Sequence, residues 1–133
     1  MTRFHILLFL SLIISVLSNG CGNQSQNTEV QNFETKEDSF NRKPERLIFT
    51  KHGKCRMNCR SIDSLEVDEI LKKGHINYVK SDTSSNNPCR KKYALEGTTR
   101  DNQLVRIIFS PCNDTQTVVT VIDMDTDWDC DCK

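Results

Sequence analysis

The heptapeptide Ser-Ile-Asp-Ser-Leu-Glu-Val, residues 61–67, carries the clearest structural signal in the chain. Asp63 is a good cap for the amino end of a helix, and Glu66, three residues later, is placed to complete a capping box. Ile62 and Val67 flank this box with the spacing of a hydrophobic staple. The heptapeptide therefore predicts that a helix begins at this point.

The segments on either side of the heptapeptide extend this prediction. Downstream, one apolar face and two closing lysines predict a helix over residues 64–73, and Gly74 follows where a left-handed C-cap belongs. Upstream, residues 46–50 form a short β-favouring run that ends at Thr50, which is a suitable helix cap. A first helix is therefore predicted over residues 51–60.

After this helical region the hydrophobic pattern changes to that of strands. Four segments rich in Val, Ile, Tyr and Phe are separated by turn-forming residues, and they cover residues 75–80, 90–97, 104–110 and 117–123. One strand, two helices and four strands in succession predict an α+β fold. We expect two N-terminal helices packed on one face of a four- to five-stranded antiparallel sheet, in the order β-α-α-β-β-β-β.

The first twenty residues have the organisation of a secretion signal. Residues 1–5 carry the positive charge of Arg3, residues 6–17 are uncharged and mostly apolar, and small residues precede Cys21. Twelve helical residues span about 18 Å, well short of the roughly 30 Å hydrocarbon core of a membrane. We therefore expect a removable signal over residues 1–20 rather than a permanent membrane span.

The cysteine directly after this signal resembles the lipobox of bacterial lipoproteins, in which cleavage occurs before a lipid-modified cysteine. The usual leucine is displaced by one position, because Leu17 lies four residues before Cys21. The resemblance implies an exported protein anchored to a bacterial membrane through Cys21, on its periplasmic or cell-surface side. The alternative is an ordinary signal peptide with an unmodified cysteine beside it.

Residues 21–45 are predicted to be a flexible tether, because Val30, Phe33 and Phe40 are their only large apolar side chains. Residues 46–133 then form one small domain. Over the whole chain eighteen basic residues balance eighteen acidic ones, which argues against a bulk electrostatic nucleic-acid binder. No nucleic-acid partner is expected.

The chain has seven cysteines, and a lipid on Cys21 leaves six: Cys55, Cys59, Cys89, Cys112, Cys130 and Cys132. An even number in an exported protein predicts a disulfide framework, whereas four such thiols in a reducing compartment would suggest zinc. Cys55 and Cys59 are one helical turn apart, and Cys130 and Cys132 share one face of an extended segment. We predict two bonds between these pairs, in an order that the sequence leaves open.

The remaining pair, Cys89 and Cys112, is predicted from the register of a hairpin. If Arg100 and Asp101 form the tip, the numbers of opposing residues sum to 201, so Cys89 lies directly opposite Cys112. Opposite positions on paired strands satisfy the geometry of a disulfide.

A longer pattern resembles a bacterial domain-of-unknown-function family. It begins with His52-Gly-Lys-Cys-Arg-Met-Asn-Cys-Arg-Ser-Ile62, which fits H-x-x-x-R-M-x-x-R-x-I, and it covers about 75 of the 133 residues. The family is distantly similar to BrnT-type toxins, which have the RelE ribonuclease fold. The resemblance implies the fold expected above, but it implies no settled activity.

His52, Arg56 and Arg60 fall on one stripe of the first predicted helix, at intervals of four residues. An imidazole beside two guanidinium groups is suited to bind an anion, and the imidazole can transfer a proton near neutral pH. The structural alternative is that the arginines pair with acidic residues of the sheet or with Glu66.

Ribonuclease activity, if the toxin resemblance extended so far, would add Lys91, Lys92 and Arg106 to this stripe. An exported protein, however, meets no messenger RNA, so the predicted signal argues against this activity.

Aspartates alternate with other residues near the C-terminus, at Asp123, Asp125, Asp127, Asp129 and Asp131. In an extended chain these carboxylates lie on one side, and Trp128 and the last two cysteines lie on the other. The row begins like a calcium loop, but the glycine and glutamate that such a loop needs are missing. We expect an amphipathic segment whose acids face water or the basic residues at 42–60, with no metal or other cofactor.

Taken together, these observations favour a membrane-anchored envelope lipoprotein whose domain is a non-enzymatic binding or interaction module. Its expected partners are the membrane, through the lipid, and an envelope protein or a small anionic ligand. Two alternatives stay open: a hydrolase or ribonuclease-derived effector of the RelE and BrnT kind, and an envelope protein that binds zinc or calcium.

Overall fold

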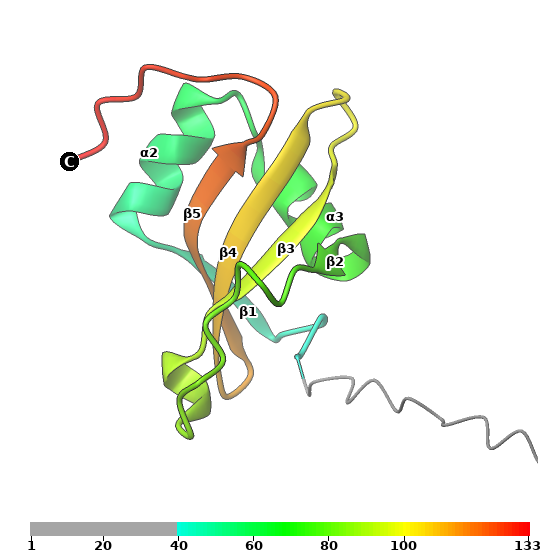
Figure 1. Cartoon of the computed structure of the whole chain (residues 1–133), viewed down its shortest axis with the longest axis vertical. Helices are drawn as coiled ribbons and strands as arrows, with labels where there is room; N and C mark the ends of the chain where they lie inside the picture. Colours follow the sequence, from blue (N-terminus) through cyan, green and yellow to red (C-terminus); the bar gives the residue numbers. More distant parts are fainter. Residues whose placement is uncertain (1–39) are drawn as a thin grey trace, which may run out of the picture. The chain divides into compact units, whose positions relative to one another are not determined.

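The computed structural model describes residues 40–133, which Figure 1 shows coloured along the sequence. The elements are β1 (Arg46–Phe49), α2 (Lys51–Cys59), α3 (Ser64–Lys73), β2 (His75–Ile76), the 3₁₀ turn η1 (Pro88–Arg90), β3 (Tyr93–Thr98), β4 (Leu104–Cys112) and β5 (Thr115–Asp123). One strand, two helices and four strands follow one another as predicted, and the α+β class is confirmed. The predicted signal, Cys21 and most of the predicted tether lie outside the described residues.

The five strands form one sheet in the order β1-β5-β4-β3-β2. Neighbouring strands are antiparallel except for β1 and β5, which run parallel. The prediction of an antiparallel sheet is therefore wrong at this edge, and the sheet is mixed. The reason is the connection: the two helices carry the chain from β1 to the opposite edge, so β1 pairs with the last strand.

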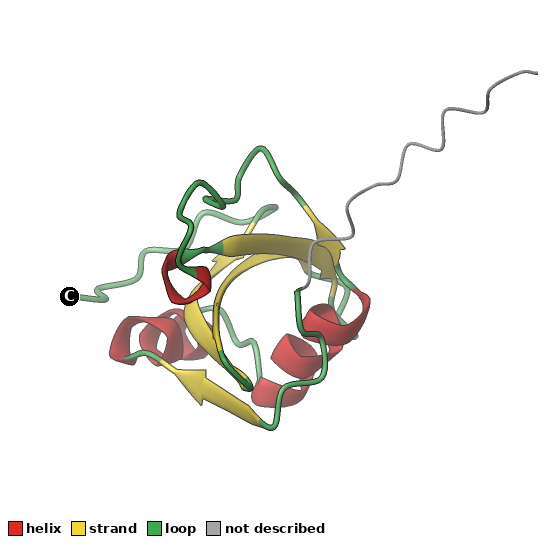
Figure 2. Cartoon of the chain, turned by 90° about the horizontal axis from the view of Figure 1, so that it is seen from below, coloured by secondary structure: helices red, strands yellow, loops and turns green. Residues whose placement is uncertain are grey.

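The two helices occupy different places on this sheet. Figure 2 shows that the sheet is curved and that α3 lies on its concave side. In Figure 1, α2 lies beside the upper part of β5, above the end of the short strand β1. α3 therefore packs on a face as predicted, while α2 lies along β5 beyond the end of β1 and turns Met57 into the same core.

One hydrophobic core joins both helices to the inner side of the sheet. Its buried members are Phe40, Met57, Ile62, Val67, Ile70, Leu71, Tyr93, Leu95, Val105, Ile107, Phe109, Val118 and Val121. Within residues 40–133, no helix has the length and apolarity needed to cross a membrane.

A β-bulge in β5 fixes the position of α2. Val119 is an extra residue relative to β4, and the resulting change of alternation turns both Val118 and Val121 into the core. The carbonyl oxygens of Val118 and Val119 accept hydrogen bonds from the N–H and the hydroxyl of Thr50, at 3.0 and 2.9 Å. Thr50 caps α2 as predicted, so the bulge and the cap join the helix to the sheet.

The heptapeptide at residues 61–67 begins α3 as predicted. Glu66 donates its N–H to a carboxylate oxygen of Asp63, and Asp63 donates its N–H to Glu66, at 2.8 and 3.0 Å. Gly74 differs from its prediction, because φ −62° and ψ 147° are extended rather than left-handed. Glycine is needed there for space, since a Cβ would lie 2.6 Å from the carbonyl oxygen of Ile70.

The folded chain includes residues that the sequence analysis places in the tether. Phe40 is only 8% exposed, and its ring centroid lies 4.8 Å from that of Tyr93. Arg42 donates hydrogen bonds to the carbonyl oxygens of Leu71 and Gly74 at the end of α3, at 3.1 and 2.8 Å. The contacts of Phe40 and Arg42 therefore extend the domain to at least residue 40.

Candidate functional site

All six cysteines among the described residues form disulfide bonds. Cys55 is joined to Cys132 and Cys59 to Cys130, with Cα–Cα distances of 5.7 and 5.9 Å. The C-terminal tail therefore runs antiparallel to α2, because the first cysteine of the helix meets the last cysteine of the tail. The structure thus gives the order of pairing that the sequence left open.

The third disulfide joins Cys89 to Cys112, with a Cα–Cα distance of 4.3 Å, but not through the hairpin register used to predict it. Opposing residues of β3 and β4 sum to 202, as in the pair Tyr93 and Phe109. Cys89 lies in the 3₁₀ turn η1, before β3 begins. The predicted strand thus starts too early, and the turn, instead of a strand, brings Cys89 to the end of β4.

Asp123 departs from the predicted row of outward carboxylates, because it is only 7% exposed. Its carboxylate accepts hydrogen bonds from the main-chain N–H groups of Asp125 and Thr126 and from the indole N–H of Trp128, at 3.0, 3.1 and 2.9 Å. Gln103 adds a fourth donor at 3.3 Å. Burial raises the pKa of Asp123, but these hydrogen bonds outweigh it and hold the pKa below its usual value.

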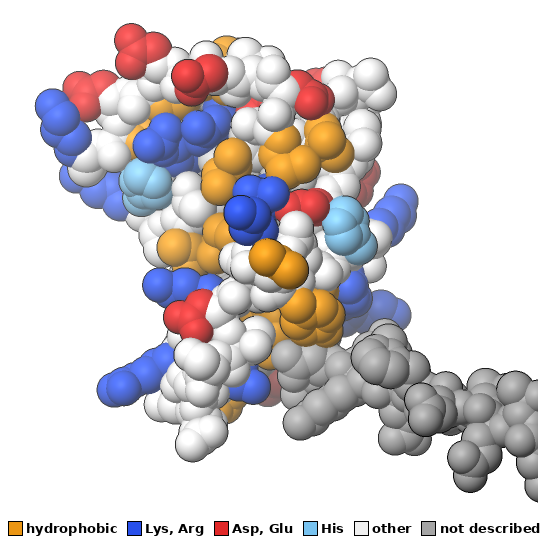
Figure 3. All heavy atoms as spheres, in the orientation of Figure 1, with side chains coloured by type: hydrophobic (Ala, Val, Ile, Leu, Met, Phe, Trp, Pro, Cys, Tyr) orange, Lys and Arg blue, Asp and Glu red, His pale blue; other side chains and the backbone are white. Residues whose placement is uncertain are grey.

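Beyond Asp123 the tail keeps the predicted alternation without forming a strand. The later aspartates are exposed, while Trp128, Cys130 and Cys132 are half-buried. Figure 3 shows acidic side chains along the upper end of the molecule, where the tail runs, with basic side chains beside them. The ion pair that the tail does form joins Asp131 to Lys133, at 3.4 Å.

The structure divides the predicted stripe of His52, Arg56 and Arg60. Arg60 is only 8% exposed and donates a hydrogen bond of 2.6 Å to the carbonyl oxygen of Val121. Arg56 donates from Nε to Nε2 of His52, at 3.4 Å, on the exposed side of α2. Burial, and then the charge of Arg56, lowers the pKa of Arg60. Arg60 therefore holds α2 to β5, and Glu66, its suggested partner, serves the cap of α3 instead.

Lys91, Lys92 and Arg106, the three residues suggested for ribonuclease chemistry, each contact a different part of the domain. Arg106 donates from Nε to Glu96, at 2.6 Å. The carbonyl of Lys91 accepts a hydrogen bond from Ser110, and Lys92 forms an isolated bridge with Asp82. Between residues 40 and 133, no hydrogen bond or ion pair joins them to His52 or Arg56.

In the described part of the chain, no group of three or more His, Cys, Asp or Glu side chains is placed to hold a metal ion. The four cysteines that a zinc site would need are joined in disulfides.

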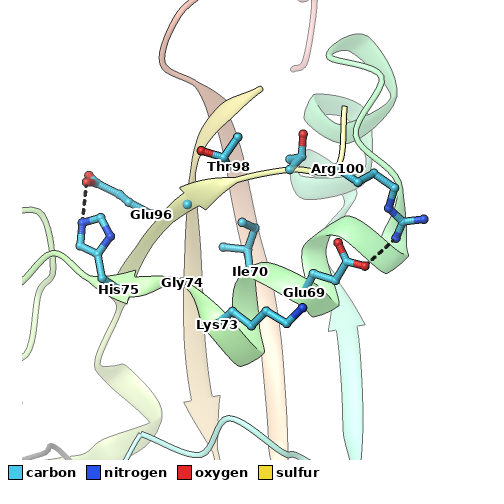
Figure 4. A pocket seen from close by; sticks show the side chains of 10 residues that line it. Glu69, Ile70, Lys73, Gly74, His75, Glu96, Thr98 and Arg100 are labelled. Carbon is cyan, nitrogen blue, oxygen red and sulfur yellow. Dashed lines mark hydrogen bonds and ion pairs between the residues drawn. The ribbon is translucent and has the colours of Figure 1, made fainter. Parts of the chain in front are cut away.

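Sequence reasoning missed a cleft of about 370 Å³ between the C-terminal end of α3 and the end of β3. Figure 4 shows its lining. At one end Glu69 pairs with Arg100 at 3.1 Å, and at the other His75 lies 3.2 Å from Glu96. Lys73 extends from α3 between these two pairs. The cleft therefore has charged walls that are already held in place.

Glu96 is the most strongly held group of the cleft, and it is only 7% exposed. It accepts hydrogen bonds from Arg106 and Asn77, at 2.6 and 2.9 Å, in addition to its contact with His75. Burial raises the pKa of Glu96, but these hydrogen bonds and the charges of Arg106 and His75 hold it below its usual value. Glu96 is therefore a fixed anion that orients His75.

No local motif identifies this cleft in the sequence. Glu96 and Arg106 are ten residues apart, and His75 is a further 21 residues away from Glu96, so they meet only through the register of β2, β3 and β4. The one usable signal is an acidic residue inside an otherwise apolar strand segment, because a charge placed there needs partners.

A family model described as Domain of unknown function (DUF4258) matches residues 49–123. The chain belongs to this family. The DUF4258 match runs from the last residue of β1 to the last residue of β5, and it contains every residue that lines the cleft. Phe40, Arg42 and the cysteine-bearing tail lie outside it, so two of the three disulfides join the matched residues to the segment that follows them. Searches of curated proteins and of solved structures gave no match.

Proposed function

We propose that this protein is an exported lipoprotein, held on the periplasmic or cell-surface side of a bacterial membrane by a lipid on Cys21. Its DUF4258 domain is then a non-enzymatic binding module. The observation that carries this proposal is the state of the cysteines: all six of the described cysteines are paired. Disulfides persist in oxidising compartments and are rare in the cytosol, so three of them support export.

The organisation of residues 1–20 supports the same compartment independently. It leaves Cys21 as the seventh cysteine, directly after the predicted cleavage point. One acyl chain binds a membrane only weakly, whereas the two or more chains of a lipoprotein anchor stably.

The binding half of the proposal is supported by the cleft. Its carboxylates, Glu69 and Glu96, are both paired within the protein, which suits a preformed recognition surface. Lys73, which also lines the cleft, contributes a further positive charge. An envelope protein or a small anionic ligand is the partner class that this charge favours.

Fractionation tests the anchor. The full chain is expressed in a bacterium that exports lipoproteins, and membranes are separated from soluble material after labelling with radioactive palmitate. We expect the label and the protein in the membrane fraction, and we expect Cys21→Ser to lose both. The double variant Cys89→Ser/Cys112→Ser is the control, because it removes two cysteines and keeps Cys21. A membrane-bound, labelled Cys21→Ser protein would refute the anchor.

Mass spectrometry of the purified protein tests the compartment. Reduction of three disulfides adds six hydrogens, so we expect a mass increase of about 6 Da after treatment with reductant. Free thiols before reduction, or zinc retained with them, would contradict the proposal.

A further inference from the structure

The sheet edge beside the cleft is open at Thr98. β2 begins at His75, which pairs with Glu96 of β3. If this register continued past Gly97, Thr98 would lie opposite Lys73, but Lys73 is the last residue of α3. The pairing of β2 with β3 thus ends at Glu96, two residues before β3 ends at Thr98.

The main chain of Thr98 is directed toward this open side. Thr98 faces Leu104 of β4, yet Leu104 uses its carbonyl oxygen for the N–H of Met124, at 2.8 Å on its far side. Such a pair exchanges no hydrogen bonds, so the N–H and C=O of Thr98 point away from β4. The N–H of the next residue, Thr99, points the other way, toward the β4 side, because it donates to the carbonyl of Gln103 across the hairpin at 2.9 Å. Thr98 therefore offers one donor and one acceptor to a further strand.

Gly97 shapes the floor of the cleft at this edge. Gly97 has no side chain of its own to fill the cleft, and a Cβ there would meet the end of the Ile70 side chain at 2.9 Å. In Figure 4, Thr98 on β3 and Lys73 on α3 lie on either side of Ile70. An extended chain thus has a backbone partner and a side wall at the same place.

The uncompensated charge at this edge is positive. Glu69 is paired with Arg100, and Glu96 is paired with Arg106 and His75. Lys73 is exposed and has no ion pair within residues 40–133. A ligand that places a carboxylate beside Lys73 completes the charge balance.

We infer that an extended polypeptide segment carrying an acidic side chain adds to β3 at Thr98. Its main chain exchanges two hydrogen bonds with Thr98, as in β-strand addition, and its carboxylate pairs with Lys73. This inference rests on the proposed function of the domain as a binding module and assigns it a class of partner and a docking edge.

Peptide titration tests the inference on the exported protein, extracted in non-ionic detergent and labelled with ¹⁵N. The probes are two mixtures of blocked pentapeptides, with aspartate or lysine fixed at the centre and every residue except cysteine elsewhere. We expect the aspartate mixture to shift the amide signals of residues 73 and 97–100. The lysine mixture is expected to bind about threefold to fivefold more weakly, the effect of one exposed ion pair.

Two variants separate backbone pairing from charge. Thr98→Pro removes the outward N–H, which an edge strand tolerates because that group makes no ladder hydrogen bond. We expect Thr98→Pro to lose binding and Thr98→Ala, which keeps the N–H, to retain it. Lys73→Gln is expected to keep weak binding and to lose the preference for the aspartate mixture. If Thr98→Pro does not fold, as judged by its amide spectrum, the Lys73→Gln comparison decides.

Several outcomes would overturn the inference. The inference fails if neither mixture shifts these signals at millimolar concentration. It also fails if folded Thr98→Pro binds the aspartate mixture as tightly as the unchanged protein. Signals that move with protein concentration alone would assign the edge to a second copy of this chain instead. Loss of peptide binding leaves the fractionation of Cys21→Ser unchanged, and a failed fractionation leaves peptide binding unchanged, so the two proposals fail separately.

Discussion

At the scale of single residues, buried acids with several donors hold the irregular parts of this protein. Asp123 is the clearest case, because its one carboxylate receives four N–H groups from the tail and from Gln103. Asp123 therefore fixes the direction in which the chain leaves β5.

Removal of this carboxylate is expected to be costly. Asp123→Ala leaves four partly buried donors without their acceptor, so we expect the free energy of unfolding to fall by about 2–4 kcal/mol. Urea unfolding with the disulfides intact measures it. Asp129→Ala is the control, because Asp129 is exposed, and a change above about 0.5 kcal/mol there would indicate a general effect of charge.

Acid is expected to destabilise the protein through Glu96 as well as Asp123. Both have pKa values lowered in the folded state, so their stabilising contribution is complete above the unfolded values and is lost as pH falls through the folded ones. We expect constant stability above about pH 5 and a decline below about pH 4. Glu96→Gln should make this decline shallower in urea titrations, whereas Glu45→Gln, at an exposed position, should leave it unchanged.

Interactions between residues close in sequence could be predicted, whereas contacts between distant residues could not. The capping box of Asp63 and Glu66 lies within four residues, so its spacing alone predicts it. Helical periodicity put Arg56 and Arg60 on one stripe, but it could not tell that Arg60 is buried against Val121. Burial depends on which strand lies beside the helix, and that is a property of the whole sheet.

At the scale of elements, Thr50 joins β1, α2 and β5 at the edge where the sheet is parallel. The hydroxyl of Thr50 accepts the N–H of Gly53 at 2.8 Å and donates to Val119 of the bulge at 2.9 Å. One side chain thus caps a helix and satisfies a strand edge.

Thr50→Val should reveal the energy of this joint. We expect the free energy of unfolding to fall by about 1–2 kcal/mol, because the change removes a helix cap and leaves the carbonyl of the bulge without its hydrogen-bond donor. Thermal unfolding measures it. Thr117→Val on β5 is the matched control, because it makes the same change on a half-buried strand position. Equal effects at both positions would show that the cap contributes nothing.

The elements themselves were predicted better than their pairing. α3 begins and ends where the sequence placed it, and β4 and β5 differ by at most two residues at either end. The segment at 75–80 was read as a strand, yet only His75 and Ile76 pair. Parallel pairing of β1 and the extra residue Val119 have no local signature, because both depend on how the helices return the chain to the sheet.

At the scale of the whole molecule, two of the disulfides are nested. Cys59–Cys130 lies inside the loop that Cys55–Cys132 closes, with sequence separations of 71 and 77 residues. When either bond is present, the other closes only a short remaining loop, so the chain entropy that it removes is small.

The two bonds are therefore expected to act non-additively. Replacing one cysteine pair with serine should lower the free energy of unfolding by about 2 kcal/mol. Replacing both pairs should lower it by about 6–7 kcal/mol, more than twice the single effect. Urea unfolding of Cys55→Ser/Cys132→Ser, of Cys59→Ser/Cys130→Ser and of the quadruple variant measures this. Simple additivity would show that local contacts, and not loop closure, dominate their contribution.

The docking of Phe40 and Arg42 determines how tension would pass through the protein. A pull from the N-terminal side, as a membrane anchor would exert, reaches the domain first at the Phe40 ring and at Asn41, whose carbonyl is bound by Gln116. It then acts through Arg42 on the carbonyl of Gly74. Gly74 lines the cleft beside Lys73, so a force applied to the chain before residue 40 would reach the wall of the cleft.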